Sequence, residues 1–146
     1  MRRTHGLICV LILLLLPSCA SDPVYHTLPE RASLGLPYSD AVRAGNLLFL
    51  SGTVGATPAT RQLVAGGVTA ETRQALENIK RNLEAHGSSM ERVVKCTVLL
   101  ADIGDFETMN AVYREYFPRN KPARTTFGVN GLPLGARVEI DCIALP

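Results

Sequence analysis

Residues 121–145 read KPARTTFGVNGLPLGARVEIDCIAL, and this stretch decides how the C-terminal part of the chain folds. Two strand-like runs flank a segment rich in Gly and Pro, a pattern typical of two strands joined as a hairpin. In the second run apolar residues alternate with Glu139 and Asp141, so the two carboxylates share one face of that strand. Arg124 opens the first run. A guanidinium and two carboxylates are therefore expected in an otherwise apolar segment.

The preceding residues predict the other elements through their hydrophobic periodicity. The expected elements are a hairpin over 41–52 with its turn at Gly45-Asn46, a helix with N-cap Thr69 that stops at Gly87, a strand over 93–100, and a helix capped by Asp105 that ends before Pro118. The order β-β-α-β-α-β-β favours an α+β fold with both helices on one face of a mixed sheet. Apolar residues on the other face would need a cover, which a homo-oligomer could provide.

The first twenty residues have the composition of an export signal. A short basic start precedes the apolar run 7–16, which is far shorter than the ~20 residues that a membrane-spanning helix needs. We therefore predict a signal peptide over residues 1–20. Its end, Leu16-Pro17-Ser18-Cys19, resembles a bacterial lipobox, in which the cysteine becomes the lipidated first residue. Cleavage after Ala20 is the alternative.

This signal sets the expected domain organisation and location. Residues 21–33 are polar and contain proline, so they are interpreted as a linker, and residues 34–146 as one folded domain. The protein is expected to be exported, either into the periplasm or to a membrane surface as a lipoprotein anchored through Cys19.

Two cysteines, Cys96 and Cys142, remain after the signal, and both lie in strand-like runs. The simpler interpretation is a pair of small buried thiols. An oxidising compartment also permits a disulfide, although the spacing does not establish that the two Cα atoms are close enough. The sequence has no Cys-x-x-Cys pair or His/Cys cluster, so no metal site is expected. The net charge of only +2 gives no basis for nucleic-acid binding.

Five short stretches follow one another along the chain: Leu36-Pro37-Tyr38-Ser39, Phe49-Leu50-Ser51-Gly52, Asp105-Phe106 through Asn110, Pro122-Ala123-Arg124-Thr125 and Val138-Glu139-Ile140. Together, from about Leu34 to Leu145, they resemble the RidA/YjgF family of reactive-intermediate (enamine/imine) deaminases. The resemblance implies a chorismate-mutase-like α+β fold that forms a homotrimer, with active sites in the clefts between subunits. It also implies hydrolysis of small 2-imino acids of the 2-aminoacrylate type to 2-keto acids and ammonia, without a metal or organic cofactor.

Within this resemblance, two residues are the candidate catalytic groups. Arg124 has the position of the family's substrate-binding arginine, whose planar fork suits a carboxylate better than a lysine would. Glu139 matches the family's acidic residue, which could orient or deprotonate the attacking water. The alternatives are a surface arginine at a strand end and a solvated carboxylate. If the two residues came from neighbouring subunits, each would neutralise the other in the cleft.

Four further residues are candidate substrate-binding groups. Ser51 lies where the family places a hydroxyl close to the ligand, and Tyr38 where a family tyrosine covers it. A turn serine and a core tyrosine are the alternatives. Asn110 either holds its local loop or contacts the substrate. Thr126 stands where the best-known members carry cysteine, a departure that affects substrate fit more than the reaction itself.

Two other functions stay open at this point. The same cleft could bind a carboxylate metabolite without catalysis, or the trimer could have a chaperone-like role. A binding protein needs the arginine but has less use for Glu139, which favours the enzyme. An exported imine hydrolase would receive its imines from an amino-acid oxidase or dehydrogenase outside the cytoplasm.

Overall fold

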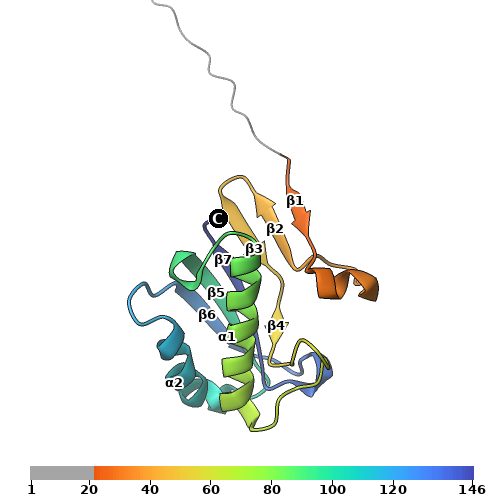
Figure 1. Cartoon of the computed structure of the whole chain (residues 1–146). Coiled ribbons are helices and arrows are strands. Elements are labelled where there is room, and N and C mark those ends of the chain that lie inside the picture. The colour runs from red at the N-terminus through yellow and green to blue at the C-terminus, as the bar shows by residue number, and fades with distance from the viewer. Residues whose placement is uncertain (1–21) are drawn as a thin grey trace, which may run out of the picture.

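The computed structural model describes residues 22–146. The predicted signal peptide, its lipobox and Cys19 lie outside this range. The described residues form one seven-stranded sheet with two α-helices (Figure 1). The elements are β1 Val24–His26, β2 Ala41–Ala44, β3 Leu47–Leu50, β4 Thr53–Val54, α1 Gly67–Ala85, β5 Val93–Leu100, α2 Phe106–Tyr116, β6 Ala123–Gly128 and β7 Val138–Ala144.

The strand order is β1-β2-β3-β7-β5-β6, and β4 continues beside β7. Every pairing is antiparallel except β5 with β6. The expectation of a C-terminal hairpin is therefore wrong, because β5 lies between β6 and β7. The connection crosses the end of β5, where Val129 donates to the Leu100 carbonyl and Ala101 donates to the Arg137 carbonyl. The long, apolar β5 thus takes a partner on each side.

The N-terminal hairpin is confirmed, with β2 and β3 joined at Gly45, whose φ is 56°. A positive φ suits glycine, which has no Cβ to clash. The first helix begins at Gly67, two residues before the expected start at Thr69, because Gly66 at the N-cap takes φ 118° and turns the chain there. The second helix begins after Asp105 as predicted, but the Asp105 carboxylate accepts hydrogen bonds from the Arg137 guanidinium instead of capping the helix.

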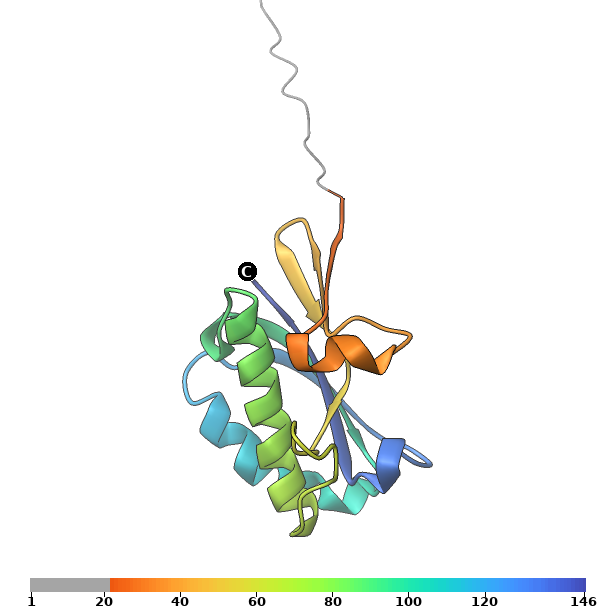
Figure 2. The same ribbon diagram turned by 45° about the vertical axis from the view of Figure 1, so that its right-hand side comes forward.

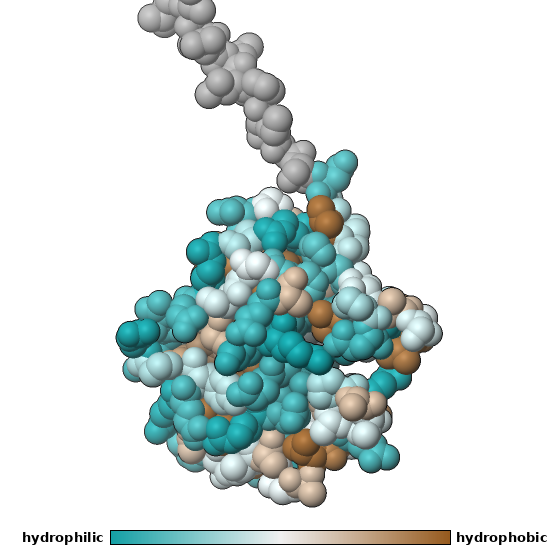
Figure 3. Space-filling view, in the orientation of Figure 1, coloured by the Kyte–Doolittle hydropathy of each residue, from teal (hydrophilic) through white to brown (hydrophobic). Residues whose placement is uncertain are grey.

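Both helices cover the same face of the sheet (Figures 1 and 2), which confirms the predicted α+β arrangement. Their outward surface is largely hydrophilic (Figure 3). The core lies between helices and sheet, and the large side chains that are fully buried there come from both layers: Leu48, Leu76, Ile79, Leu83, Val98, Leu100, Met109, Val138 and Ile140. The other face of the sheet has no helix over it, and its Phe49, Val94 and Phe127 are 40%, 41% and 52% exposed.

Part of the segment interpreted as a linker is folded. It contains β1, which pairs with β2, and a 3-10 helix over Pro29–Leu34. The buried carboxylate of Asp40 fixes this segment, because it accepts from the backbone N–H of Leu28 at 2.8 Å and pairs with the Arg31 guanidinium at 2.9 Å. The folded region therefore extends to Val24, and its 3-10 helix forms one wall of the cavity described below.

The two core cysteines form a disulfide, contrary to the simpler interpretation of two separate thiols. Cys96 on β5 and Cys142 on β7 are direct cross-strand partners, with their Cα atoms 4.1 Å apart. Both are completely buried under the helices. The sequence could not establish this pairing, because it depends on β5 and β7 being neighbours, which the expected hairpin did not provide.

Candidate functional site

Strand pairing places the two candidate catalytic residues on opposite faces of the sheet. Arg124 is the partner of Cys96, whose side chain belongs to the helix-covered core. Glu139 is the partner of Leu99, one residue out of phase with the buried Val98. Because side chains alternate along a strand, Arg124 faces the helices and Glu139 faces the uncovered side. Within one chain the two groups belong to separate sites.

The arginine half-site consists of Arg124 and Thr126 on β6 together with Phe106, Asn110 and Tyr113 on α2. The Arg124 guanidinium lies 4.7 Å from the centroid of the Tyr113 ring and 5.5 Å from that of Phe106. Such cation–π contacts hold a guanidinium in place while leaving its N–H groups free to bind an anion. Asn110 is buried and lies four residues after Phe106 and three before Tyr113, so it shares their helix face.

Two hydroxyls in the arginine half-site are buried without a partner. The Tyr113 and Thr126 hydroxyl oxygens have no hydrogen-bond partner within residues 22–146. Burial raises the pKa of Tyr113 to about 12, although the positive charge of Arg124 opposes this, so the phenol stays neutral and can donate a hydrogen bond. Buried hydroxyls without partners are costly. The half-site is therefore ready to accept a ligand or an ordered water.

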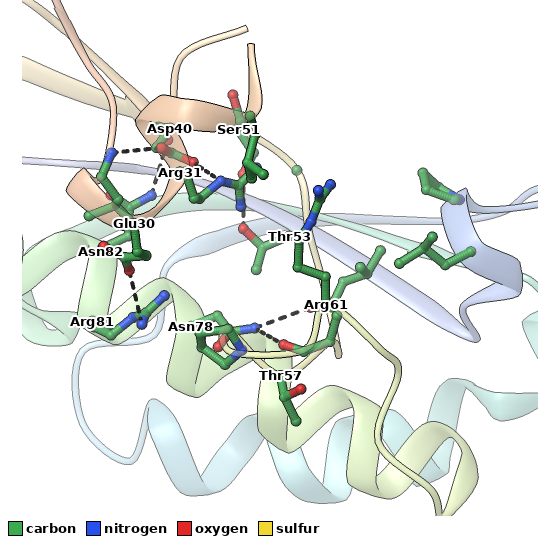
Figure 4. A pocket seen from close by; sticks show the side chains of 18 of the residues that line it. Glu30, Arg31, Asp40, Ser51, Thr53, Thr57, Arg61, Asn78, Arg81 and Asn82 are labelled. Carbon is green, nitrogen blue, oxygen red and sulfur yellow. Dashed lines mark hydrogen bonds and ion pairs between the residues drawn. The ribbon is translucent and has the colours of Figure 1, made fainter. Parts of the chain in front are cut away.

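The glutamate half-site consists of Glu139, Tyr38 and Ser51 and the cavity that they line. This cavity has a volume of about 570 Å³ and also includes Arg31, Arg61 and Leu134 in its walls. Its walls come from the Pro29–Leu34 helix, the loop after β4, the C-terminal half of α1 and the loop before β7 (Figure 4). The molecular surface is hollowed between the first and last of these segments (Figure 3).

Glu139 is one of the carboxylates that line the cavity. Partial burial raises its pKa above the usual value for a glutamate, and the neighbouring carboxylate of Asp141 raises it further. Its carboxylate lies against the backbone of Gly52, where any Cβ would overlap it. The Ser51-Gly52 sequence therefore permits the close approach of strand and carboxylate. A raised pKa makes this carboxylate a stronger base, which suits it to accepting a proton from water.

Ser51 and Tyr38 both line the cavity, but their hydroxyl groups make different hydrogen bonds. The Ser51 hydroxyl donates to the Ser39 carbonyl at 2.6 Å, so it supports the loop, and its oxygen can still accept from a ligand. Tyr38 is 49% exposed and is not a core residue, contrary to the alternative considered from sequence. Its hydroxyl accepts from the Arg31 guanidinium at 3.1 Å, which orients the ring at the rim.

Sequence reasoning missed the cavity's other charged residues. Arg31 pairs with Asp40 at 2.9 Å, and Arg81 on α1 pairs with Glu30 at 3.1 Å. Arg61 comes from the loop between β4 and α1, which is rich in Gly, Pro and Thr and where no spacing pattern marked it. These residues come from segments far apart in sequence, so only the folded arrangement brings them together.

The described chain offers no metal centre, since no three His, Cys, Asp or Glu side chains between residues 22 and 146 could hold an ion. Within the same range no helix is both long and apolar enough to cross a membrane.

Residues 30–146 match the family model described as Endoribonuclease L-PSP. The chain is 46% identical over 127 residues to the chloroplastic Reactive Intermediate Deaminase A of Arabidopsis thaliana, covering 87% of this chain and 67% of that protein. It is 48% identical over 109 residues to the human 2-iminobutanoate/2-iminopropanoate deaminase, covering 75% and 80%. The crystal structure of E. coli TdcF with bound serine superposes with a TM-score of 0.71 at 34% identity, covering 76% of this chain and 89% of TdcF.

Proposed function

This chain belongs to the RidA/YjgF family, and we propose that it hydrolyses small 2-imino acids to 2-keto acids and ammonia. The reaction converts R–C(=NH2⁺)–COO⁻ and water into R–C(=O)–COO⁻ and NH4⁺. The observation that carries the proposal is the pair of complementary half-sites. One presents a guanidinium held by aromatic rings, and the other presents a glutamate of raised pKa in a cavity.

The active enzyme in this proposal is a homotrimer in which the arginine half-site of one subunit faces the glutamate half-site of the next. Two observations support it. The half-sites lie on opposite faces of the sheet, so one chain cannot bring them to the same substrate. The uncovered sheet face also exposes Phe49 and Phe127, and burying such side chains between subunits stabilises an oligomer.

In the proposed mechanism, Arg124 binds the substrate carboxylate through two parallel hydrogen bonds. Glu139 accepts a proton from water as the water oxygen attacks the imine carbon, giving a neutral carbinolamine. The protonated Glu139 then transfers this proton to the amino group. As the C–N bond breaks, Glu139 takes the hydroxyl proton, the carbonyl forms, and the departing ammonia receives that proton as NH4⁺.

The remaining candidate residues shape the bound state. Thr126 and Tyr113 offer hydroxyls beside the carboxylate, and Asn110 offers an amide on the same helix face. Ser51 and Tyr38 lie on the side of the cleft with Glu139, where Tyr38 would close over the ligand. Thr126 supplies a β-branched side chain with a hydroxyl and a methyl group where the best-known members have the unbranched thiol of cysteine, so it acts on substrate fit.

A direct assay tests the function. An amino-acid oxidase generates the imine from alanine or 2-aminobutanoate, and semicarbazide traps what is not hydrolysed. The wild-type protein should lower the trapped amount, and Arg124→Ala should remove this effect. Arg119→Gln, which changes an exposed arginine just before β6, is the matched control and should behave as wild type. Saturable binding of a 2-keto acid without any rate effect would instead identify a metabolite-binding protein.

We also propose that the protein is exported and held at a membrane through a lipid on Cys19. The disulfide between Cys96 and Cys142 supports export, because such bonds persist mainly in oxidising compartments. The variant Cys19→Ala should move the protein from the membrane fraction to the soluble fraction. An unchanged membrane fraction would refute lipidation at this residue.

A further inference from the structure

Two residues of the described chain, Arg61 and Leu134, combine a side chain with a positive φ, at 58° and 62° respectively. This left-handed conformation is unfavourable for a residue with a Cβ and most of all for a bulky one. Such positions persist where the surroundings impose them, and they cluster at ligand-binding sites. Arg61 and Leu134 lie 73 positions apart in sequence, yet both line the cavity that contains Glu139.

The loop that carries Arg61 is fixed and does not fray. Its stem is closed by the bridge between Ala56 and Leu63, and its tip by the N–H of Arg61, which donates to the Thr57 carbonyl at 2.8 Å. Asn78 on α1 donates to the Ala56 carbonyl at 2.8 Å, which ties the loop to the helix. The strained backbone at Arg61 is thus part of an ordered turn. Figure 4 shows its side chain extended from this turn toward the side of the cavity where Thr53 lies.

The charge balance of the cavity leaves Arg61 free. The guanidinium groups of Arg31 and Arg81 are each neutralised by a carboxylate within about 3 Å. Arg61, in contrast, has no carboxylate of residues 22–146 within salt-bridge distance. The cavity therefore holds one unpaired cation, Arg61, and one unpaired carboxylate, Glu139, beside two ion pairs. A guanidinium binds a carboxylate through two parallel hydrogen bonds, so an anionic group is the chemical complement of this position.

The size of the cavity fits a substrate longer than the smallest imino acids. Its volume of about 570 Å³ lies in the range of ligand pockets, about 300–1,000 Å³. A three-carbon imino acid at Glu139 would leave much of this space unfilled. Leu134, which also lines it, can cover an aliphatic segment between the reacting carbon and a distal anionic group.

We propose that Arg61 is a specificity residue that binds a second carboxylate on the substrate, so that the protein favours 2-imino dicarboxylic acids over neutral 2-imino acids. This inference rests on the proposed function, in which the reacting carbon lies at Glu139 and the neighbouring subunit's arginine half-site binds the first carboxylate. Arg61 then binds the far end of the molecule. The class of reaction that supplies such a substrate is the oxidation of an acidic amino acid at its Cα–N bond.

The test compares two imines in the trapping assay. One is generated from alanine, and the other from aspartate or glutamate by an oxidase specific for acidic amino acids. For the wild type, kcat/KM should be higher for the dicarboxylic imine. The variant Arg61→Gln should lower the dicarboxylic-to-neutral ratio of kcat/KM by about ten- to a hundredfold, since a charge-assisted contact is lost. Arg81→Gln removes the same charge from the same cavity, but from a residue paired with Glu30, and should change the ratio less than about threefold.

A second variant separates the effect of the Arg61 side chain on substrate preference from the effect of its backbone conformation on stability. Arg61→Gly relieves the positive φ, so the melting temperature should rise, while the ratio should fall as it does in Arg61→Gln. A wild-type protein that favours the neutral imine, or an equal ratio in wild type and Arg61→Gln, would overturn the inference and leave the proposed function standing.

If the wild type hydrolyses neither imine, the proposed function fails, and binding decides the inference separately. Calorimetric affinities for 2-oxoglutarate and 2-oxobutanoate are measured for the wild type and Arg61→Gln. A preference for the dicarboxylate that drops at least tenfold in the variant supports Arg61 as its ligand. Equal affinities in the two proteins overturn it.

Discussion

The arginine half-site and the glutamate half-site differ in what holds their side chains in place. Arg124 lies on a strand and is packed against two aromatic rings of α2, above the disulfide-linked partner strand. Glu139 also lies on a strand, but the cavity around it is walled by α1, by a 3-10 helix and by two loops, which ion pairs and backbone hydrogen bonds hold in place. The first half-site is therefore suited to a constant task, binding the carboxylate common to all substrates. The second is suited to variation in the rest of the molecule.

The largest expected effect tests whether the two half-sites act together across subunits. Arg124→Ala and Glu139→Gln should each reduce kcat/KM by at least about a hundredfold, because each removes a charged group that contacts the substrate. If the two variants are unfolded, mixed and refolded together, some interfaces combine an intact arginine half-site with an intact glutamate half-site. About one quarter of the wild-type activity should return, as random mixing of a closed oligomer predicts. The trapping assay on the mixture measures it.

Absence of recovery, with mixed oligomers demonstrated by native mass spectrometry, would show that each chain carries its own complete site. Refolding each variant alone is the control and should give no activity. The Arg124→Ala/Glu139→Gln double variant contributes no intact half-site. Refolding it together with wild type should therefore lower the activity below that of the wild type alone.

The next effect concerns the rigidity beneath the arginine half-site. Cys96 is the strand partner of both Cys142 and Arg124, so the disulfide stabilises the strand beside the arginine. Removing it in Cys96→Ala/Cys142→Ala should lower the free energy of unfolding by about 2–4 kcal/mol. Denaturant unfolding with and without a reducing agent measures this. The reductant should destabilise wild type that is unfolded and refolded in its presence, and it should leave the double variant unchanged. Equal stabilities of the wild type and the double variant without reductant would contradict the prediction.

The packed helices and strands around Arg124 were more predictable from the sequence than the cavity around Glu139. Periodicity predicted the packed elements, and the motif around Arg124 marked a residue that the structure places on aromatic rings. The sequence did not connect the rings of Phe106 and Tyr113 with the arginine, because β6 was expected to pair with β7. The insertion of β5 between β6 and β7 depends on contacts between residues far apart in sequence, which the local hydrophobic pattern does not encode.

The loop-built cavity was less predictable. Glu139, Ser51 and Tyr38 were identified through the family motifs, and the structure places all three in the lining of one cavity. Arg61 carried no signal, because a single arginine in a Gly/Pro/Thr-rich loop is usually solvated and its left-handed backbone is invisible in the sequence. Its position depends on hydrogen bonds to α1 and within the turn, which form only in the folded chain.

A smaller effect is expected from the two aromatic rings, Phe106 and Tyr113, that hold the Arg124 guanidinium. Tyr113→Leu removes the ring closest to the Arg124 guanidinium, so KM should rise about three- to thirtyfold, in line with the strength of a partly desolvated cation–π contact. Tyr113→Phe keeps the ring and removes only the hydroxyl. It should resemble wild type in KM if the ring positions the arginine. A larger loss in Tyr113→Phe would instead assign the main role to the phenol as a hydrogen-bond donor.

The smallest effect is a shift in the pH dependence set by Glu139. Its pKa is raised, first by burial and then by Asp141, and catalysis requires its ionised form, so kcat/KM should rise with pH through that raised pKa. Asp141→Asn removes the like charge and lowers the pKa of Glu139. The acidic limb of the kcat/KM profile should therefore move to lower pH by less than about one unit, because burial remains. Asp102→Asn, on an exposed turn, should not move it. A shift to higher pH would mean that Asp141 acts on Glu139 by something other than its charge, for example by orienting a shared water, and the loop-built half-site would then depend on its strand as strongly as the arginine half-site does.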